Sequence, residues 1–248
     1  MRKLPKKLQT CPIVDSIIEI RFETPLDKGA VFGYIYSLIM DQYKQPVRNL
    51  PESQLPEAVR NADPNLRYKP LYSIEGDKSI IQIGTNIIAI SSKNPYIGWA
   101  DLSQHFVNII NKIGMANPAI IRKVTRLGLR YINFFEGDIS DKVEMSFKMT
   151  DGYQPKDVFI RSTVIDSGFT NVVQFSNNVN YNDKINNTIK NGSIIDIDTS
   201  QEYSDSSFLV NIKREIDNAH NCEKKLFFSI LKKDFIDKFK PIYNDEVE

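Results

Sequence analysis

The sequence contains few of the side chains that most often carry chemistry. Only two histidines and two cysteines occur among its 248 residues. A structural zinc site commonly takes four such ligands, paired at short spacing, whereas these four are scattered: Cys11, His105, His220 and Cys222. We therefore expect partly exposed or hydrogen-bonded histidines, packed thiols and no metal site.

An excess of positive charge is also missing. Lysine and arginine number 32 and aspartate and glutamate number 31, which gives a net charge of +1. A dedicated nucleic-acid-binding protein usually carries a basic excess. A local basic patch within the neutral total would still allow such binding.

No apolar run approaches the roughly 20 residues that span a bilayer. The basic start resembles the beginning of a signal peptide, but Pro5, Pro12, Asp15 and Glu19 interrupt any apolar segment. Two cysteines suit a reducing compartment, because secreted disulfide frameworks normally carry more. We expect a cytoplasmic protein that does not associate with membranes.

Common catalytic and cofactor motifs are absent. The sequence has no G-x-S-x-G elbow, no G-x-x-x-x-G-K-[ST] phosphate loop and no G-x-G-x-x-G fingerprint. Both histidines lie beside ordinary apolar helix stripes, which gives no local support to a Ser-His-Asp or Cys-His arrangement. We assign no catalytic residue and no cofactor, and we expect a binding protein rather than an enzyme.

Strand and helix patterns succeed one another along the first half of the chain. Period-two apolar patterns predict strands and 3.6-residue patterns predict helices. Strands are expected over 12–23, 70–75, 79–83, 87–92 and 121–135. Helices are expected from a cap at Asp27 to an end at Pro46, and from about Asp101 to a C-cap at Gly114. The loop over 46–70 is expected to hold one short helix near 55–61.

The second half continues with more strands and ends in a helix. Strands are expected over 144–150, 158–166, 171–179 and 194–199. The asparagine-rich stretch 176–191 indicates a loop or a long hairpin tip. From Ser206 to the high 230s, apolar residues keep a helical period, and the polar patch 221–225 is where a break or kink is expected.

This order predicts an α+β fold, because hairpin-linked strands give mainly antiparallel sheets. We expect helices packed on one face of the sheets, two similar lobes and a long C-terminal helix. The lobes would comprise 1–137 and 138–248, unless the chain forms one continuous domain.

Three arginines with a spacing of four are the most prominent surface feature. Arg122, Arg126 and Arg130 share one face of the strand over 121–135, and Gly128 lies between two of them. They could bind phosphate or a partner's carboxylates, since guanidinium offers planar paired donors. They could instead form an ion-pair ladder with Asp15 and Glu19 of the first strand, which we favour.

Two aromatic residues precede the second helix. Tyr96 and Trp99 flank a glycine in NPYIGWADL. They could form a ligand platform or a protein-binding hot spot, where Trp and Tyr are enriched. The alternative is that they fasten the start of the helix to the core.

Asp196 and Asp198 share a strand face in IIDIDT. Such a pair can hold Mg²⁺ together with a substrate phosphate, as in a metal-dependent nuclease. Alternating apolar and acidic residues are also the ordinary pattern of a strand with one solvated face, and we give this nuclease hypothesis the lowest weight.

Four segments together resemble a known group of proteins. They are CPIVDSIIEIRF (11–22), YIGW (96–99), RLGLRYIN (126–133) and IDNAHNCEKKLFF (216–228). The chain resembles a sporadically distributed, uncharacterised bacterial family of about 250 residues, in which a second N-terminal proline stands where this chain has Cys11. The resemblance implies no activity, and the patchy occurrence of the family implies an association with mobile elements or anti-phage defence islands.

Three functions follow as hypotheses. We favour a non-enzymatic module that binds a protein encoded nearby, in a defence or toxin-control system. The alternatives are a nucleic-acid or nucleotide binder that uses the arginine row, and a metal-dependent nuclease. Homo-oligomers are compatible with each of them.

Overall fold

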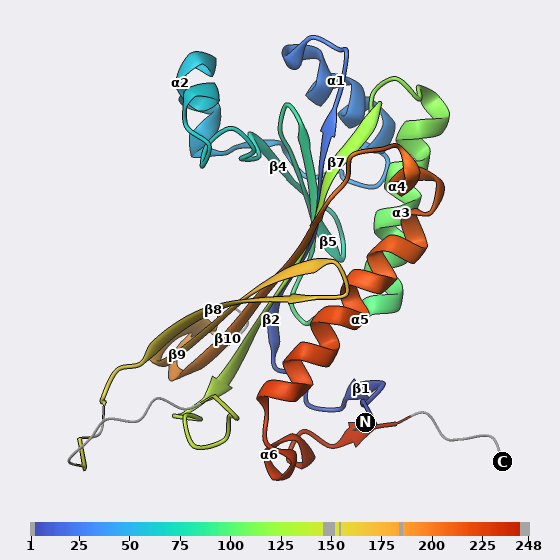
Figure 1. Cartoon of the computed structure of the whole chain (residues 1–248). Helices are drawn as coiled ribbons and strands as arrows, with labels where there is room; N and C mark the ends of the chain where they lie inside the picture. Colours follow the sequence, from blue (N-terminus) through green and yellow to red (C-terminus); the bar gives the residue numbers. More distant parts are fainter. Residues whose placement is uncertain (1–2, 146–151, 154, 184–185, 244–248) are drawn as a thin grey trace, which may run out of the picture. The chain divides into compact units, whose positions relative to one another are not determined.

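The computed structural model describes residues 3–145, 152–153, 155–183 and 186–243, which form two compact units (Figure 1). Unit 1 comprises Met1–Val14, Arg130–Thr199 and His220–Glu248, and unit 2 comprises Asp15–Leu129 and Ser200–Ala219. The units interleave along the chain, so their border does not coincide with the expected division at residue 137. Strand β7 (Lys123–Glu136) passes from unit 2 into unit 1 after Leu129.

The α+β class expected from the sequence is confirmed. The other strands are β1 (Lys7–Leu8), β2 (Ile13–Glu23), β3 (Arg48–Asn49), β4 (Tyr72–Glu75), β5 (Ser79–Ile83), β6 (Ile87–Ser92), β8 (Phe159–Asp166), β9 (Phe169–Asp183), β10 (Thr188–Glu202) and β11 (Pro241–Ile242). The helices are α1 (Lys28–Ile39), the 3-10 helix η1 (Pro51–Gln54), α2 (Glu57–Ala62), α3 (Trp99–Ala116), α4 (Ser207–Val210), α5 (Ile212–Ile230) and α6 (Lys233–Asp237). None of the described helices combines the length and the apolar character that a membrane crossing requires.

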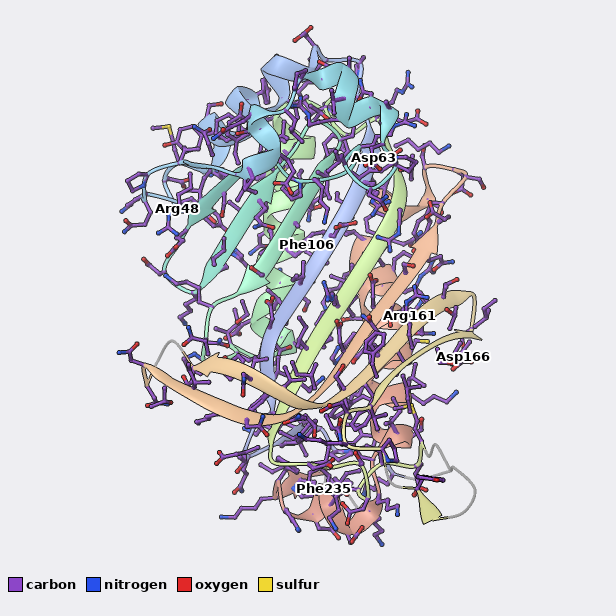
Figure 2. All side chains as sticks on the ribbon, turned by 90° about the vertical axis from the view of Figure 1, so that its left-hand side faces the viewer. Arg48, Asp63, Phe106, Arg161, Asp166 and Phe235 are labelled. Atoms are coloured by element: carbon purple, nitrogen blue, oxygen red, sulfur yellow. The ribbon has the colours of Figure 1, made fainter. Side chains whose placement is uncertain are left out.

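Unit 2 is built on strands in the order β3-β4-β5-β6-β2-β7. The β2–β6 and β5–β6 pairs are antiparallel, with Ile20 opposite Ile88 and Ile81 opposite Ile90. Helix α3 runs along one face of this sheet beside α1 (Figure 1), and Figure 2 shows its Phe106 behind the strands. The predicted apolar stripe of α3 is confirmed, because all of its members are at most 2% exposed: Leu102, Phe106, Ile109, Ile110 and Ile113.

Unit 1 contains the end of β7 followed by β10, β9 and β8 in that order, and β1 pairs separately with β11. One face of these strands packs against α5 and α6. The shared core draws on both layers, with Phe135, Val173, Phe175, Ile195 and Ile197 from the strands and Phe227, Phe228, Ile230, Phe235 and Ile236 from the helices. β8 is the last strand in the order, so one of its two edges has no neighbour among the described strands.

Three predicted helix features are wrong. Helix α1 ends at Ile39, before the predicted end at Pro46. Helix α3 continues past Gly114 and ends at Ala116, since glycine weakens a helix but does not by itself stop one. Helix α5 runs unbroken through 221–225, where Cys222 and Glu223 face the core and Lys225 is exposed. The polar patch therefore belongs to an amphipathic helix, and the helical segment is interrupted instead at Asn211, between α4 and α5, and after Ile230, before α6.

The asparagine-rich stretch is mostly strand rather than loop. β9 and β10 extend through it and are 15 residues long each. Asparagine side chains bond across the hairpin: the Asn191 amide donates to Asn178 at 3.1 Å and to Asn180 at 3.2 Å. These bonds offset the low strand propensity of asparagine.

Two further local predictions are confirmed, and a third lies mostly outside the described residues. The Asp27 cap of α1 is confirmed, since its carboxylate accepts from the Gly29 backbone N–H at 2.9 Å. The loop over 46–70 holds the expected short helix as α2. The strand expected over 144–150 lies mostly outside the described residues.

Candidate functional site

The arginines of β7 are engaged in ion pairs. In unit 2, Arg122 contacts Glu23 at 2.8 Å and Arg126 contacts Glu19 at 2.9 Å. Glu19 was expected as a partner of the arginine row, and Arg126 is the arginine that contacts it. Arg126 also lies 3.6 Å from Glu202. The expected contact with Asp15 stays a prediction. These carboxylates compensate the guanidinium charges, so an incoming phosphate would have to displace them.

Gly128 explains how Arg126 reaches its partner. A Cβ atom at this position would lie 2.7 Å from Arg126 Nη1 and 3.7 Å from Glu19 Oε1. The Arg126 guanidinium therefore occupies the space that a side chain at position 128 would fill.

In unit 1, Arg130 holds Asp196, which the sequence offered as a metal ligand. The guanidinium donates to both carboxylate oxygens, at 2.9 and 2.5 Å, and the Gln174 amide adds a bond of 3.2 Å. Asp196 is only 7% exposed. No group of three or more metal-ligating side chains occurs among the described residues. Asp196 is thus an ion-pair acceptor within the sheet, and Asp198 follows it on the same strand face.

Trp99 fastens α3 to α5 within unit 2. Its indole N–H donates to Asp217 at 2.8 Å, and the Lys213 ammonium lies 5.8 Å from the ring centre. Tyr96, three residues earlier, is half-buried. For Trp99 this is the helix-fastening arrangement that the sequence offered as the alternative to a binding platform.

Both histidines are hydrogen-bonded, as the sequence predicted. In unit 2, His105 Nε2 lies 2.7 Å from the Tyr43 hydroxyl, which contacts Ser79 Oγ at 2.9 Å. Burial lowers the pKa of His105 below its usual range and raises the pKa of Tyr43 to about 12. The three side chains form one hydrogen-bonded cluster, in which the tautomer of His105 decides which groups donate. In unit 1, His220 Nδ1 contacts the Tyr131 hydroxyl at 3.2 Å.

A pocket of about 580 Å³ opens beside Tyr43 and His105. Its rim mixes Lys44 and Lys78 with Asp77 and Asp101, together with amide side chains. A pocket of this size suits a small molecule. The mixed charge of the rim, however, favours no class of ligand. The Tyr43 hydroxyl, the Ser79 hydroxyl and the His105 imidazole already form hydrogen bonds with one another.

The two cysteines differ from each other. Cys222 is buried, as predicted, and its thiol lies 3.6 Å from the Asn171 amide. Cys11 is exposed, which contradicts the expectation of a packed thiol. It precedes β2 and lies on the surface of unit 1.

The most unusual surface of unit 1 is the open edge of β8, a site that sequence patterns did not identify. Phe159 and Ile165 are 65% and 77% exposed, and Val164 is 36% exposed. Figure 2 labels Arg161 and Asp166, the only charged residues of this strand. In the sequence, the one sign of this surface is that FIRSTVID carries apolar residues on both strand faces. That pattern does not show which strand lies at the edge of a sheet.

Natural sheets usually protect such an edge. The common devices are lysine or proline on the strand, a bulge, or a very short strand. β8 has eight residues, with neither lysine nor proline, and it pairs with β9 in one unbroken register from Phe159↔Ser176 to Asp166↔Phe169. Within the part of the chain that the structure describes, β8 therefore presents a regular edge with no neighbouring strand, flanked by exposed apolar side chains.

Contacts with α5, the core and β9 hold β8 in place within unit 1. The Lys225 ammonium on α5 contacts Asp166 at 3.0 Å, and Ile160 packs against the core of unit 1. The Asn177 side chain accepts from the Val158 N–H at 2.7 Å. A strand fixed at both ends needs little ordering when another strand joins it.

No protein-family model matches the chain, and no curated protein matches it.

Proposed function

We propose that this chain is a non-enzymatic protein-binding module whose binding element is the open edge of β8. The observation that carries the proposal is a full-length edge strand with unprotected backbone groups beside exposed Phe159 and Ile165. Exposed, regular edges of this kind attract other strands. A natural chain that retains one is explained most simply by a partner that covers it.

The binding mode is strand addition. Backbone hydrogen bonds along β8 supply affinity, and side chains at alternate positions supply specificity. The exposed face offers Phe159 and Ile165 to apolar residues of the incoming strand, with Arg161 between them as a donor for a carboxylate or hydroxyl. Burying two large apolar side chains contributes roughly 1.5–3 kcal/mol each.

The arginine row gives less support to nucleic-acid binding, because Arg122, Arg126 and Arg130 each contact a carboxylate. Asp196 gives little support to a nuclease for the same reason. The setting of a bacterial anti-phage defence or toxin-control system is part of the proposal and rests on the family resemblance alone.

The test is co-purification of the tagged chain with the products of its neighbouring genes, followed by amide hydrogen exchange of β8. The outward-facing amides of residues 159, 161, 163 and 165 should exchange quickly in the dilute monomer, whose β8 edge is open, and slowly wherever another strand covers that edge. Residues 160, 162 and 164 bond β9 in both states and serve as internal controls. A complex that leaves the odd-numbered amides unprotected would refute strand addition.

A matched pair of variants supports the same test. Thr163→Pro removes one N–H that faces away from β9, whereas Thr163→Ala keeps it. We expect the proline variant to lose the partner and the alanine variant to retain it.

A further inference from the structure

Resting on the proposed function of the β8 edge, we infer that the strand it receives is β8 of a second copy of this chain. The two strands run antiparallel about a two-fold axis that passes beside Ser162. In this arrangement Phe159 lies opposite Ile165 of the second copy, and Arg161 lies opposite Thr163 of the second copy. Three observations select it: the direction of the backbone groups, the charges and the apolar residues.

The β8–β9 hairpin fixes which backbone groups face the open edge. Its two-residue turn has φ of 54° at Ser167 and 84° at Gly168, as in a type I′ turn. The residues that flank such a turn, Asp166 and Phe169, form a hydrogen-bonded pair, and the pairs then alternate along the ladder. The Asn177 N–H donates to the Val158 carbonyl at 3.2 Å, which places even-numbered residues on the β9 side throughout.

Odd-numbered residues therefore direct their N–H and C=O groups outward. An antiparallel neighbour must place its own outward groups opposite them. Two copies of β8 can then pair only with odd residues opposite odd residues. Every register that sets an odd residue opposite an even one is excluded, which removes half of the possibilities.

Charge and apolar character choose among the remaining registers. Centring the axis on Arg161 would oppose two guanidinium groups, and like charges directly opposite each other are destabilising. Centring it on Thr163 would set Arg161 opposite Ile165 and leave Phe159 beyond the partner strand. Centring it on Ser162 pairs Phe159 with Ile165 twice and opposes no like charges.

The Ser162-centred register also brings together the two β8 faces that carry Ile160 and Val164. Ile160 packs against the core of unit 1, and Val164 is 36% exposed on the same strand face. The register places Ile160 of one copy opposite Val164 of the other, at a non-hydrogen-bonded position where side chains approach most closely. The two core faces thus become continuous across the axis.

A cysteine scan tests both the dimer and its register. At the axis, the two Ser162 residues form a non-hydrogen-bonded pair with Cα atoms about 4.5 Å apart, within the range for a disulfide. Ser162→Cys, in a Cys11→Ser background that removes the exposed native thiol, should give a covalent dimer under mild oxidation. Arg161→Cys and Thr163→Cys should not, because each is offset from its own copy by two residues, about 6.6 Å along the strand. Faster cross-linking at either control position would overturn this register.

Sedimentation of the purified chain tests the dimer without cross-links. The Ser162-centred pairing makes each Thr163 N–H a donor to Arg161 of the second copy. Thr163→Pro should therefore weaken dimerisation by about ten- to a hundredfold, since it removes two hydrogen bonds per dimer, while Thr163→Ala should remain dimeric. Circular dichroism checks that both variants are folded, and the Ser162→Cys result is decisive if the proline variant is not.

The outcomes separate this inference from the proposed function. A chain that stays monomeric at high concentration, and whose Ser162→Cys variant does not cross-link, overturns the dimer. If a different protein then protects the odd-numbered amides of β8, the edge is still a binding site and only its occupant is different. If no conditions protect those amides, both proposals fail.

Discussion

Glu223 provides the sharpest quantitative test of the structure. It lies on the inner face of α5 in unit 1 and is 4% exposed. Among the described residues its carboxyl has no hydrogen-bond or ion-pair partner. Burial raises its pKa from 4.5 to about 8, and the ammonium of the adjacent Lys224 lowers it only slightly in return. The carboxyl is therefore protonated in the folded protein at pH 7.

The stability of the fold should fall with rising pH because of this group. Below pH 4.5 the carboxyl is protonated in both the folded and the unfolded chain, and it contributes nothing. Between pH 4.5 and about 8 the unfolded chain loses the proton and the folded chain keeps it, so unfolding releases a proton. At 1.36 kcal/mol per pKa unit, the loss is on the order of 3 kcal/mol at pH 7 and 5 kcal/mol at pH 8 and above.

The perturbation is Glu223→Gln, which keeps the shape of the side chain and removes its titration. Urea unfolding, followed by circular dichroism at pH 4, 5.5, 7 and 8.5, gives the unfolding free energy of both proteins. We expect similar values at pH 4 and a growing advantage of the glutamine variant at higher pH. Glu136→Gln, at an exposed position, should change little at any pH. Equal pH dependence in the wild type and Glu223→Gln would refute the reasoning.

Three further variants test the packing within the units. Gly192→Ala should destabilise by about 3 kcal/mol or more in urea unfolding, because its Cβ would lie 2.1 Å from the Phe135 carbonyl oxygen; a loss below 1 kcal/mol would contradict that contact. Gly114→Ala should instead stabilise by about 0.5–1 kcal/mol, because nothing lies within 4 Å of its Cβ, and a lowered melting temperature would count against the helix there. Trp99→Phe should cost about 1 kcal/mol by losing the bond to Asp217. Asp217→Ala loses that bond and also the contact with Lys213, so adding Trp99→Phe to Asp217→Ala should cost little more than Asp217→Ala alone; fully additive effects would show that the Trp99–Asp217 bond is unimportant.

The sequence by itself determined the local elements of this protein. Alternation over 12–23 located β2, and the glycine- and asparagine-containing turns around 79–83 and 87–92 located β5 and β6, all to within a residue or two, because such patterns depend on neighbours in the chain. The stripe of α3 was found for the same reason. Where a local signal was ambiguous, as at 221–225, burial in the tertiary structure decided the outcome.

The candidate site depended on tertiary structure almost entirely. A carboxylate partner for Arg126 could be guessed as Glu19, but the pairing of Arg130 with Asp196 requires knowing that β7 and β10 are neighbours. The sequence showed that 158–166 forms a strand. Only the order of strands showed that it is an edge, since the hydrogen bonds that a strand lacks are set by which segments lie beside it and not by its own residues.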